Sequence, residues 1–251
     1  MTRLEAPAKL TWTLEVTGRR DDGRHELRAE MVALAFGDHL ELDEGGDGLS
    51  VVGPYSAVPA DGTNLVARAL ALVGRRAGVT LVKEVPPGGG LGGGSSDAAA
   101  ILRWAGGVPA EAALELGADV PFCQVGGRAL VEGVGERVTP LQFVAREVTL
   151  VLTGLHLDTG AVYAAYDELV ASGERPTGRN HLEAAARRVA PRLATVIDWL
   201  GATLGERVHL AGSGSSLFVE GHLEPGLATW EVTGPEGPVR FRQTTTVPRG
   251  A

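Results

Sequence analysis

The sequence contains little that would support a disulfide framework, a membrane anchor or a nucleic-acid-binding surface. It has one cysteine, Cys123, which excludes an internal disulfide and a cysteine-cluster metal site. No apolar run approaches the roughly 18 residues of a membrane-spanning helix, and the first residues, Met1 to Leu10, hold no apolar signal core. Its 23 Lys and Arg against 31 Asp and Glu give a net charge of −8, which argues against general binding to nucleic-acid backbones. We therefore expect a cytoplasmic protein that binds neither membranes nor nucleic acids.

Glycine, by contrast, is abundant, with 36 of the 251 residues, about twice the ordinary share. Hydrophobic residues make up 44% of the chain, which is enough for a substantial core. The length suits one large domain or two small, closely packed ones. Because no long linker interrupts the chain, we place a packed boundary near residue 147, between an N-terminal domain (1–147) and a C-terminal domain (148–251).

Hydrophobic periodicity and turn residues predict strands that alternate with helices. In segment 4–16, Leu10, Trp12 and Leu14 alternate with polar residues, as in a half-buried strand. Asn64 is expected to cap the helix that follows it. The predicted strands span 4–16, 26–36, 79–85, 148–152, 208–211, 217–220 and 240–243, and the predicted helices span 64–76, 95–104, 159–171 and 180–200, the last one broken at Pro191.

The densest glycine cluster lies between a predicted strand and a predicted helix, in PPGGGLGGGSSDAAA (Pro86 to Ala100). Glycines let backbone N–H groups approach a bulky anion, and the N-terminus of the following helix directs its positive end to the same place. The hydroxyls of Ser95 and Ser96 can add hydrogen-bond donors or a magnesium contact. The segment therefore predicts a phosphate-binding loop.

Three other interpretations of this loop fit less well. A Walker loop requires a lysine after the glycines, whereas Ser95 follows Gly94 here. Gly88, Gly90 and Gly93 satisfy the G-x-G-x-x-G pattern of dinucleotide sites, but a run of glycines satisfies almost any such pattern, and this one lies outside a leading βαβ unit. A flexible surface loop is the third alternative, although such loops seldom end in an amphipathic helix.

Three segments in this order resemble the motifs of the GHMP small-molecule kinases: APAKL (Ala6 to Leu10), the glycine segment, and AGSGSSLF (Ala211 to Phe218). Further stretches are similar to the 4-diphosphocytidyl-2-C-methyl-D-erythritol kinases, a family that phosphorylates the 2-hydroxyl of its substrate in the non-mevalonate isoprenoid pathway. They cover nearly the whole chain. These stretches are EVTGRRDDGRHEL (Glu15 to Leu27), NLV (Asn64 to Val66), GADVPF (Gly117 to Phe122), GERVTPL (Gly135 to Leu141) and NHLE (Asn180 to Glu183).

The resemblance implies an α+β protein with the GHMP kinase fold. Its N-terminal domain would be ribosomal-protein-S5-domain-2-like, and its C-terminal domain an α/β sandwich (ferredoxin-like). ATP and the acceptor, a cytidine diphosphate alcohol, would meet in the cleft between them. By the same resemblance, Asp119 would orient the acceptor hydroxyl and take its proton, and Lys9 would lie beside it and stabilise the developing negative charge.

The resemblance also implies which residues hold each substrate. Magnesium would accompany ATP, with Ser96 as its expected ligand. The cytosine of the acceptor would contact His25 and stack on Tyr163. ATP would be held by Asn64, Pro86, Pro87, Gly88, Gly89, Gly90, Leu91, Gly92, Gly93, Gly94, Ser95 and Ser96, and the acceptor by Thr11, Arg24, His25, Thr159, Tyr163, Gly212 and Ser213.

Several positions depart from the family pattern, mostly at the acceptor end. Thr11 stands where the family has asparagine, Arg24 where it has a tyrosine that stacks on cytosine, and His181 where it has aspartate. Arginine can stack as a planar cation, so Arg24 is expected to contact the base. A GHMP kinase for a different small alcohol and a non-catalytic nucleotide-binding paralogue are therefore alternatives. We expect a monomer or a weak homodimer.

Overall fold

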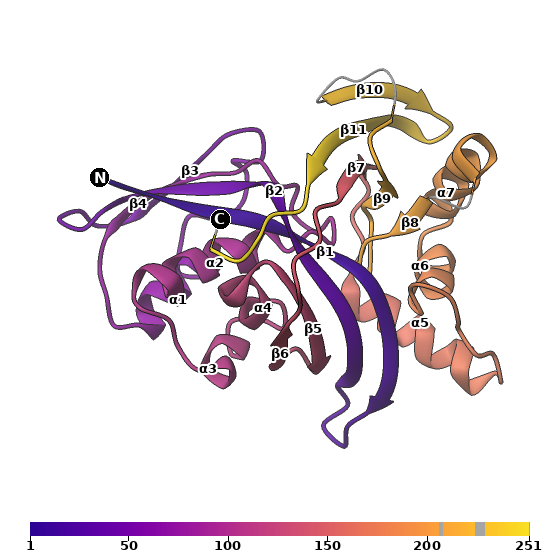
Figure 1. Ribbon diagram of the computed structural model, residues 1–251, viewed down its shortest axis with the longest axis horizontal. Coiled ribbons are helices and arrows are strands. Elements are labelled where there is room, and N and C mark those ends of the chain that lie inside the picture. The colour runs from indigo at the N-terminus through magenta and orange to yellow at the C-terminus, as the bar shows by residue number, and fades with distance from the viewer. Residues whose placement is uncertain (206–207, 224–228, 251) are drawn as a thin grey trace.

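The computed structural model describes residues 1–205, 208–223 and 229–250 and arranges them around two sheets (Figure 1). The first half of the chain contains β1 (Thr2–Arg19), β2 (His25–Asp43), β3 (Leu49–Val52), α1 (Leu65–Leu72), β4 (Gly78–Val82), α2 (Gly93–Trp104), α3 (Ala110–Leu114), α4 (Val120–Val125), β5 (Arg128–Gly133) and β6 (Arg137–Pro140). The second half contains β7 (Glu147–Leu152), α5 (Thr159–Ala171), α6 (Glu183–Val189), α7 (Pro191–Leu204), β8 (Val208–Leu210), β9 (Leu217–Glu220), β10 (Thr229–Gly234) and β11 (Gly237–Thr245).

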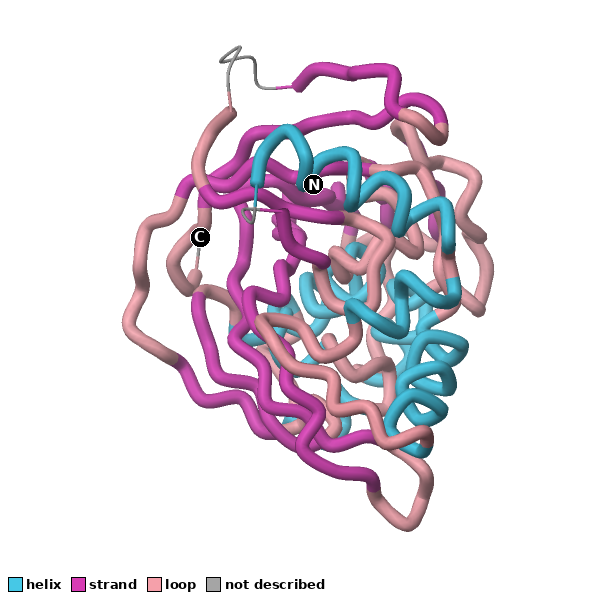
Figure 2. The backbone as a smooth tube through the Cα atoms, turned by 90° about the vertical axis from the view of Figure 1, so that its right-hand side faces the viewer, coloured by secondary structure: helices cyan, strands magenta, loops and turns pink. Residues whose placement is uncertain are grey.

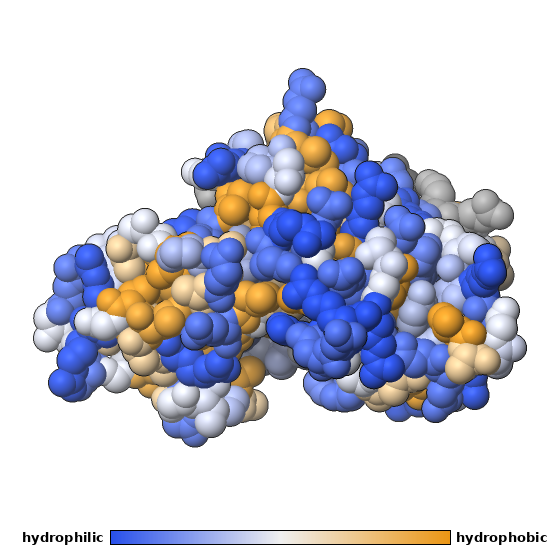
Figure 3. All heavy atoms as spheres, turned by 90° about the horizontal axis from the view of Figure 1, so that it is seen from below, coloured by the Kyte–Doolittle hydropathy of each residue, from blue (hydrophilic) through white to orange (hydrophobic). Residues whose placement is uncertain are grey.

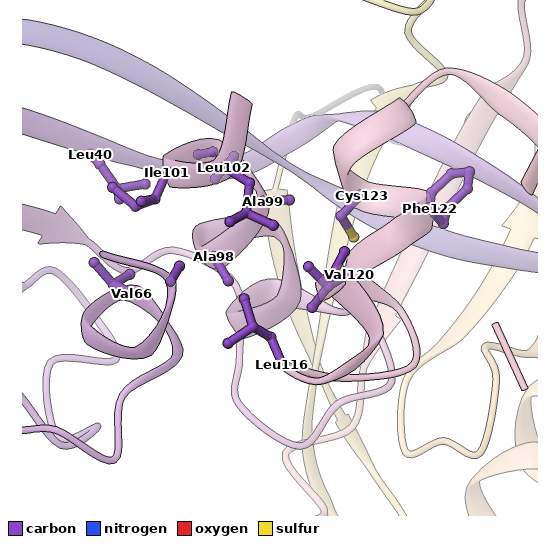
Figure 4. Packing of buried hydrophobic residues seen from close by; sticks show 14 of the residues in the cluster. Leu40, Val66, Ala98, Ala99, Ile101, Leu102, Leu116, Val120, Phe122 and Cys123 are labelled. Carbon is purple, nitrogen blue, oxygen red and sulfur yellow. The ribbon is translucent and has the colours of Figure 1, made fainter. Parts of the chain in front are cut away.

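The first sheet is built around a long antiparallel hairpin of β1 and β2. Its strand order is β3-β4-β2-β5-β6, with β1 paired to β2, and the parallel pair β3 and β4 is connected through α1. Helices α1 to α4 pack on one face of this sheet and bury a common apolar core. Figure 4 shows Leu40 of β2, Val66 of α1, Ile101 of α2 and Val120 of α4 in this core. The core fixes α2, and therefore the glycine segment before it, against the hairpin.

The second sheet is antiparallel, in the order β10-β11-β7-β9-β8, and carries α5, α6 and α7 on one face. Side chains of the hairpin, including Leu14, join the core under these helices. A third apolar cluster lies between the two sheets and joins Leu10 and Leu34 of the hairpin to Leu150 and Phe218 of the second sheet. The two halves are therefore packed together through a shared core, and Figure 2 shows the course of the backbone through their strands and helices.

Most predicted elements are confirmed, with some ends shifted. Helix α5 and strand β9 have the predicted bounds, and Asn64 caps α1 by accepting a hydrogen bond from the backbone N–H of Val66 at 2.9 Å. The helix predicted over 64–76 ends at Leu72, because Gly74 adopts a left-handed backbone with φ of 62°. Strands β3, β5, β6 and β10 and helix α4 were not predicted. Strand β7 begins at Glu147, and the division into two domains there remains a prediction.

Hydrophilic side chains predominate on the face shown in Figure 3, and its apolar side chains lie in separate patches. Such scattered patches are ordinary for protein surfaces and specify no partner. In the described residues, no helix is long and apolar enough to cross a membrane. The expected monomer or weak homodimer remains a prediction.

Candidate active site

A cavity of about 520 Å³ lies where the two halves of the molecule meet, and it collects most of the predicted site residues. Its walls come from β1, the glycine segment, the start of α4 and the start of α5. The loop after β8 completes it. The predicted residues that line the cavity are Lys9, Thr11, Asn64, Pro86, Pro87, Gly88, Gly89, Gly90, Gly92, Gly93, Gly94, Ser95, Asp119, Thr159, Tyr163, Gly212 and Ser213.

The glycine segment packs between β1 and the loop after β8. The backbone N–H of Lys9 donates to the carbonyl of Leu91 at 3.0 Å, and the N–H of Ser216 donates to the carbonyl of Gly89 at 3.0 Å. A Cβ on Gly90 would lie 2.5 Å from the carbonyl oxygen of Ala211, so only glycine fits there. The three motifs that are distant in sequence are thus held together by backbone contacts, which place the glycine loop on one wall of the cavity.

Lys9 and Asp119 form an ion pair within this cavity. Lys9 Nζ lies 3.2 Å from Asp119 Oδ2 and donates to Thr11 Oγ1 at 3.1 Å. Lys9 and Thr11 are buried, whereas the Asp119 side chain is 30% exposed, so its carboxylate is accessible from the cavity. An accessible carboxylate beside a buried ammonium can accept a proton from a hydroxyl while the cation stabilises nearby negative charge. The expected neighbourhood of Lys9 and Asp119 is confirmed; their catalytic role stays a proposal.

The two serines that follow the glycines have different surroundings in the structure. Helix α2 begins at Gly93, two residues earlier than predicted, and this start sets which serine faces the cavity. Ser95 lines the cavity, whereas Ser96 is buried and its hydroxyl donates to the carbonyl of Pro7. Successive helical residues point about 100° apart, so only one of the two serines can face the cavity. Ser96 therefore does not reach the position expected of a magnesium ligand, and Leu91 is likewise buried outside the described lining.

A buried charge cluster that sequence analysis missed lies beside the glycine segment, where a Cβ on Gly93 would be 2.8 Å from Lys83 Nζ. Lys83 Nζ contacts Asp38 and lies 2.7 Å from Asp97 Oδ2, and all three side chains are at most 4% exposed. Asp38 also accepts hydrogen bonds from the backbone N–H groups of Glu84 and Val85. Asp97 Oδ1 is buried without a hydrogen-bond partner among the described residues. Lys83, Asp97 and Asn64 thus add polar groups to the lining of the cavity.

Burial raises the pKa of the Asp97 carboxyl from 3.8 to about 8, and the neighbouring Asp38 acts in the same direction against the opposing charge of Lys83. Burial thus favours the protonated form of Asp97 to a higher pH than for an ordinary carboxyl. The folded protein binds this proton more tightly than the unfolded chain does. The contribution of the Asp97 proton to the free energy of unfolding is therefore complete below about pH 4 and is lost as the pH rises toward about 8.

Asp97→Asn is expected to reduce this decline in stability, because an amide of the same shape does not ionise. The measurement is the free energy of unfolding in urea at pH 5, 7 and 9 for both proteins. Parallel pH profiles of the variant and the original protein would contradict the proposed protonation of Asp97. Asp38→Asn is the comparison variant: it removes the carboxylate beside Lys83, and we expect it to cost about 3 kcal/mol at pH 5, where a neutral Asp97 leaves the Lys83 charge uncompensated.

At the acceptor end, the structure brings together only some of the residues expected there. Thr159 and Ser213 line the cavity, and their hydroxyls lie 3.0 Å apart. Tyr163 is the one aromatic side chain in the described lining. Arg24 instead pairs with Asp22 at 2.8 Å, is 58% exposed, and lies outside that lining.

His25 also differs from expectation, since its side chain lies behind Tyr163. The two rings stack directly, with centroids 4.7 Å apart and an angle of 23° between their planes. His25 is absent from the described lining of the cavity. A base therefore does not fit between His25 and Tyr163 in this arrangement, and the predicted contacts of Arg24 and His25 with the base stay predictions.

One sequence signal could have revealed Lys83. The chain contains 21 arginines but only two lysines, Lys9 and Lys83, and both are buried in the cavity wall. Almost every basic residue of this chain is arginine, so the rare lysines indicate sites that require a compact charge on a flexible side chain.

Comparisons with known proteins agree with this geometry. A family model for the GHMP kinases N terminal domain matches residues 64–127. The chain is 38% identical over 234 residues to a protein of Paracoccus denitrificans named 4-diphosphocytidyl-2-C-methyl-D-erythritol kinase, covering 86% of this chain and 85% of the relative. A Thermus thermophilus protein of the same name is 37% identical, covering 87% and 86% of the two chains.

Solved structures show the same similarity. A crystal structure of 4-(cytidine 5′-diphospho)-2C-methyl-D-erythritol kinase matches all of both chains with a TM-score of 0.70 and 32% identity. L. major mevalonate kinase matches 100% of this chain and 97% of its own with a TM-score of 0.58, but at 15% identity it supports the fold alone. The two sheets with their helices are thus the GHMP kinase fold that the motifs predicted.

Proposed function

Because the chain belongs to the family of 4-diphosphocytidyl-2-C-methyl-D-erythritol kinases, ATP-dependent enzymes that transfer phosphate to an alcohol, we propose that the cavity holds both substrates and that Lys9 and Asp119 act on the transferred group. The single observation that carries this proposal is the Lys9–Asp119 pair, 3.2 Å apart, in a cavity also walled by the glycine loop. The Lys83–Asp97 pair lines the same cavity, but both of its side chains are at most 4% exposed, whereas the Asp119 side chain is 30% exposed.

In the proposed mechanism, Asp119 orients the acceptor hydroxyl and takes its proton as the oxygen attacks the γ-phosphorus. The bond from that phosphorus to the leaving oxygen of ADP breaks, and the phosphate is transferred in line. Lys9 is held by Asp119 and Thr11, so its ammonium is already in place to stabilise charge on the transferring oxygens. Most of the catalytic effect comes from this positioning, because phosphoryl transfer requires little covalent chemistry from the protein.

The glycine loop is proposed to hold the phosphates of ATP. Its backbone N–H groups and the N-terminus of α2 supply donors and positive potential without intervening side chains. We place the nucleoside end of ATP beside Asn64, which lines the same cavity.

Magnesium is proposed to accompany ATP, and the residues present fit an ion held mainly by phosphates. In the described part of the chain, no three His, Cys, Asp or Glu side chains form a metal site. Mg²⁺ commonly takes one or two protein oxygens and completes its shell with phosphates and water. Ser95 replaces Ser96 as the proposed ligand, because it lines the cavity and faces the segment of Asp119. Once bound, the ion would neutralise phosphate charge.

The proposed substrate is tested by a coupled ADP-release assay with 4-diphosphocytidyl-2-C-methyl-D-erythritol. Robust turnover is expected, with no ADP formed when the acceptor is omitted. Turnover only with another small alcohol would identify a different GHMP kinase activity. ATP binding by calorimetry without turnover of any acceptor would indicate the non-catalytic paralogue.

Arg24→Ala is expected to leave the KM of the acceptor within about twofold, because the Arg24 side chain is exposed and pairs with Asp22 away from the cavity. Tyr163→Leu is the contrasting variant: it removes the ring that lines the cavity, and loss of one stacking contact is expected to raise that KM about tenfold. Steady-state kinetics at saturating ATP measure both. A tenfold rise in Arg24→Ala would show that Arg24 moves to the base when the acceptor binds.

A further inference from the structure

Asp167 on α5 links three groups at the acceptor end of the molecule. Its Oδ1 lies 2.7 Å from His25 Nε2, and its Oδ2 lies 3.2 Å from Arg19 Nη1. His25 and Arg19 flank the turn of the β1–β2 hairpin, whereas Asp167 belongs to the second half of the chain. The carboxylate thus connects the hairpin end to α5, and it fixes the proton of the His25 ring on Nε2, since a carboxylate accepts but does not donate.

The His25 ring in turn supports the wall of the cavity. One face stacks on Tyr163 at 4.7 Å, and Tyr166 meets the ring edge-on at 6.0 Å with an interplanar angle of 90°. Tyr163 lines the cavity, whereas neither His25 nor Asp167 belongs to its described lining. Tyr163 and Asp167 lie one turn apart on α5, and the His25 ring contacts both of them.

We infer that Asp167 is a positioning residue for the acceptor: it orients His25, and through that ring it fixes Tyr163 as the flat surface on which the base of the acceptor stacks. This inference rests on the proposed function. It follows from Tyr163 being the one aromatic residue in the described lining, with Arg24 turned away to Asp22. A stacking surface binds best when its ring is already oriented, because less conformational freedom is lost on binding.

The contact between His25 and Asp167 is a hydrogen bond to a carboxylate, and it is half-buried. The His25 side chain is 10% exposed and that of Asp167 is 32% exposed. Asp167 makes no contact with the glycine loop or with Lys9 among the described interactions. Its loss should therefore affect acceptor binding selectively.

The experiment compares Asp167→Ala and Asp167→Asn with the original protein. Asp167→Ala is expected to raise the KM of the acceptor about tenfold, with kcat and the KM of ATP changed less than twofold. Asp167→Asn retains an oxygen that accepts from Nε2–H and is expected to restore the KM to within about threefold. Glu168→Gln is the matched control, since Glu168 is the next residue of α5 and pairs at 3.4 Å with Arg188.

An unchanged acceptor KM in Asp167→Ala would overturn the inference, and so would an equal rise of both KM values, which indicates general loosening of the fold. The tautomer of His25, observed in long-range ¹H–¹⁵N NMR spectra, provides a readout without turnover. We expect an Nε2-bound proton in the original protein and a mixed tautomer in Asp167→Ala. If the original protein phosphorylates no cytidine diphosphate alcohol, the proposed function fails, while the spectra still decide whether Asp167 orients His25.

Discussion

Asp119→Asn is expected to lower kcat by about 10² or more, while the dissociation constant of ATP stays within about threefold. The amide has nearly the shape of the carboxylate but does not accept the proton of the acceptor hydroxyl. It also removes the charge that lies 3.2 Å from Lys9 Nζ, although Thr11 still accepts from that ammonium. The coupled ADP-release assay measures kcat, and calorimetry measures ATP binding.

The fold is expected to tolerate this change. Asp119 stands at the N-cap position of α4 but makes no capping hydrogen bond with its side chain in the described structure, so the substitution removes no cap. Asp47→Asn is the matched control, because Asp47 is exposed and pairs with Arg76 at 2.9 Å, outside the cavity lining. Near-normal turnover in Asp119→Asn would remove this residue from the mechanism, whatever the result for Asp47→Asn.

The sequence predicted best those elements whose apolar pattern is uninterrupted. The hairpin strand around Leu10 and Trp12 alternates cleanly, and α5 is bounded by an Asp158 cap and a glycine at position 173, so both were found. Strands β3 and β10 were not predicted, because they are short and none of their side chains is fully buried. Such edge strands derive their conformation from a neighbouring strand, which local pattern does not reveal.

The ordered motifs predicted the Lys9–Asp119 pair and the glycine loop, because each motif is a contiguous stretch. The cluster of Lys83, Asp38 and Asp97 could not be predicted in that way. Residue 38 is brought beside residue 83 only by the register of β2 against β4, in which His39 lies opposite Val82. Asp97 joins them through the packing of α2 on the sheet. Contacts of this kind depend on register and helix rotation rather than on sequence spacing.

The same reasoning explains the misplaced residues at the acceptor end. The resemblance assigned Arg24 and His25 to the base, but here Arg24 pairs with Asp22 and His25 pairs with Asp167. Asp22 is close in sequence and exposed, whereas Asp167 lies 142 residues away from His25 on another element. A motif therefore predicted the location of the acceptor end but not the orientation of its side chains.

Gly90→Ala is expected to lower ATP affinity about 10²-fold. Gly90 has a φ of 78°, and a Cβ there would lie 2.5 Å from the carbonyl oxygen of Ala211 and 2.8 Å from that of Gly214. Both obstacles are backbone atoms, so the loop itself must shift away from the segment that holds it. Such a shift turns away the N–H groups that are proposed to hold the phosphates. Because these donors stabilise phosphate only when they already point toward it, ATP binding weakens. Calorimetry with ATP measures the loss.

Gly107→Ala is the control that distinguishes the steric clash at Gly90 from the cost of placing alanine in a left-handed conformation. Gly107 has a similar φ of 84°, but a Cβ there would meet no described atom within 4 Å, and the residue is exposed between α2 and α3. This variant should lose about 1 kcal/mol of stability from the left-handed conformation alone and bind ATP normally. Gly90→Ala should lose more stability, measured by urea unfolding, and should lose the affinity as well. If the folded Gly90→Ala protein bound ATP as tightly as Gly107→Ala, the phosphates would have to lie elsewhere than on this loop.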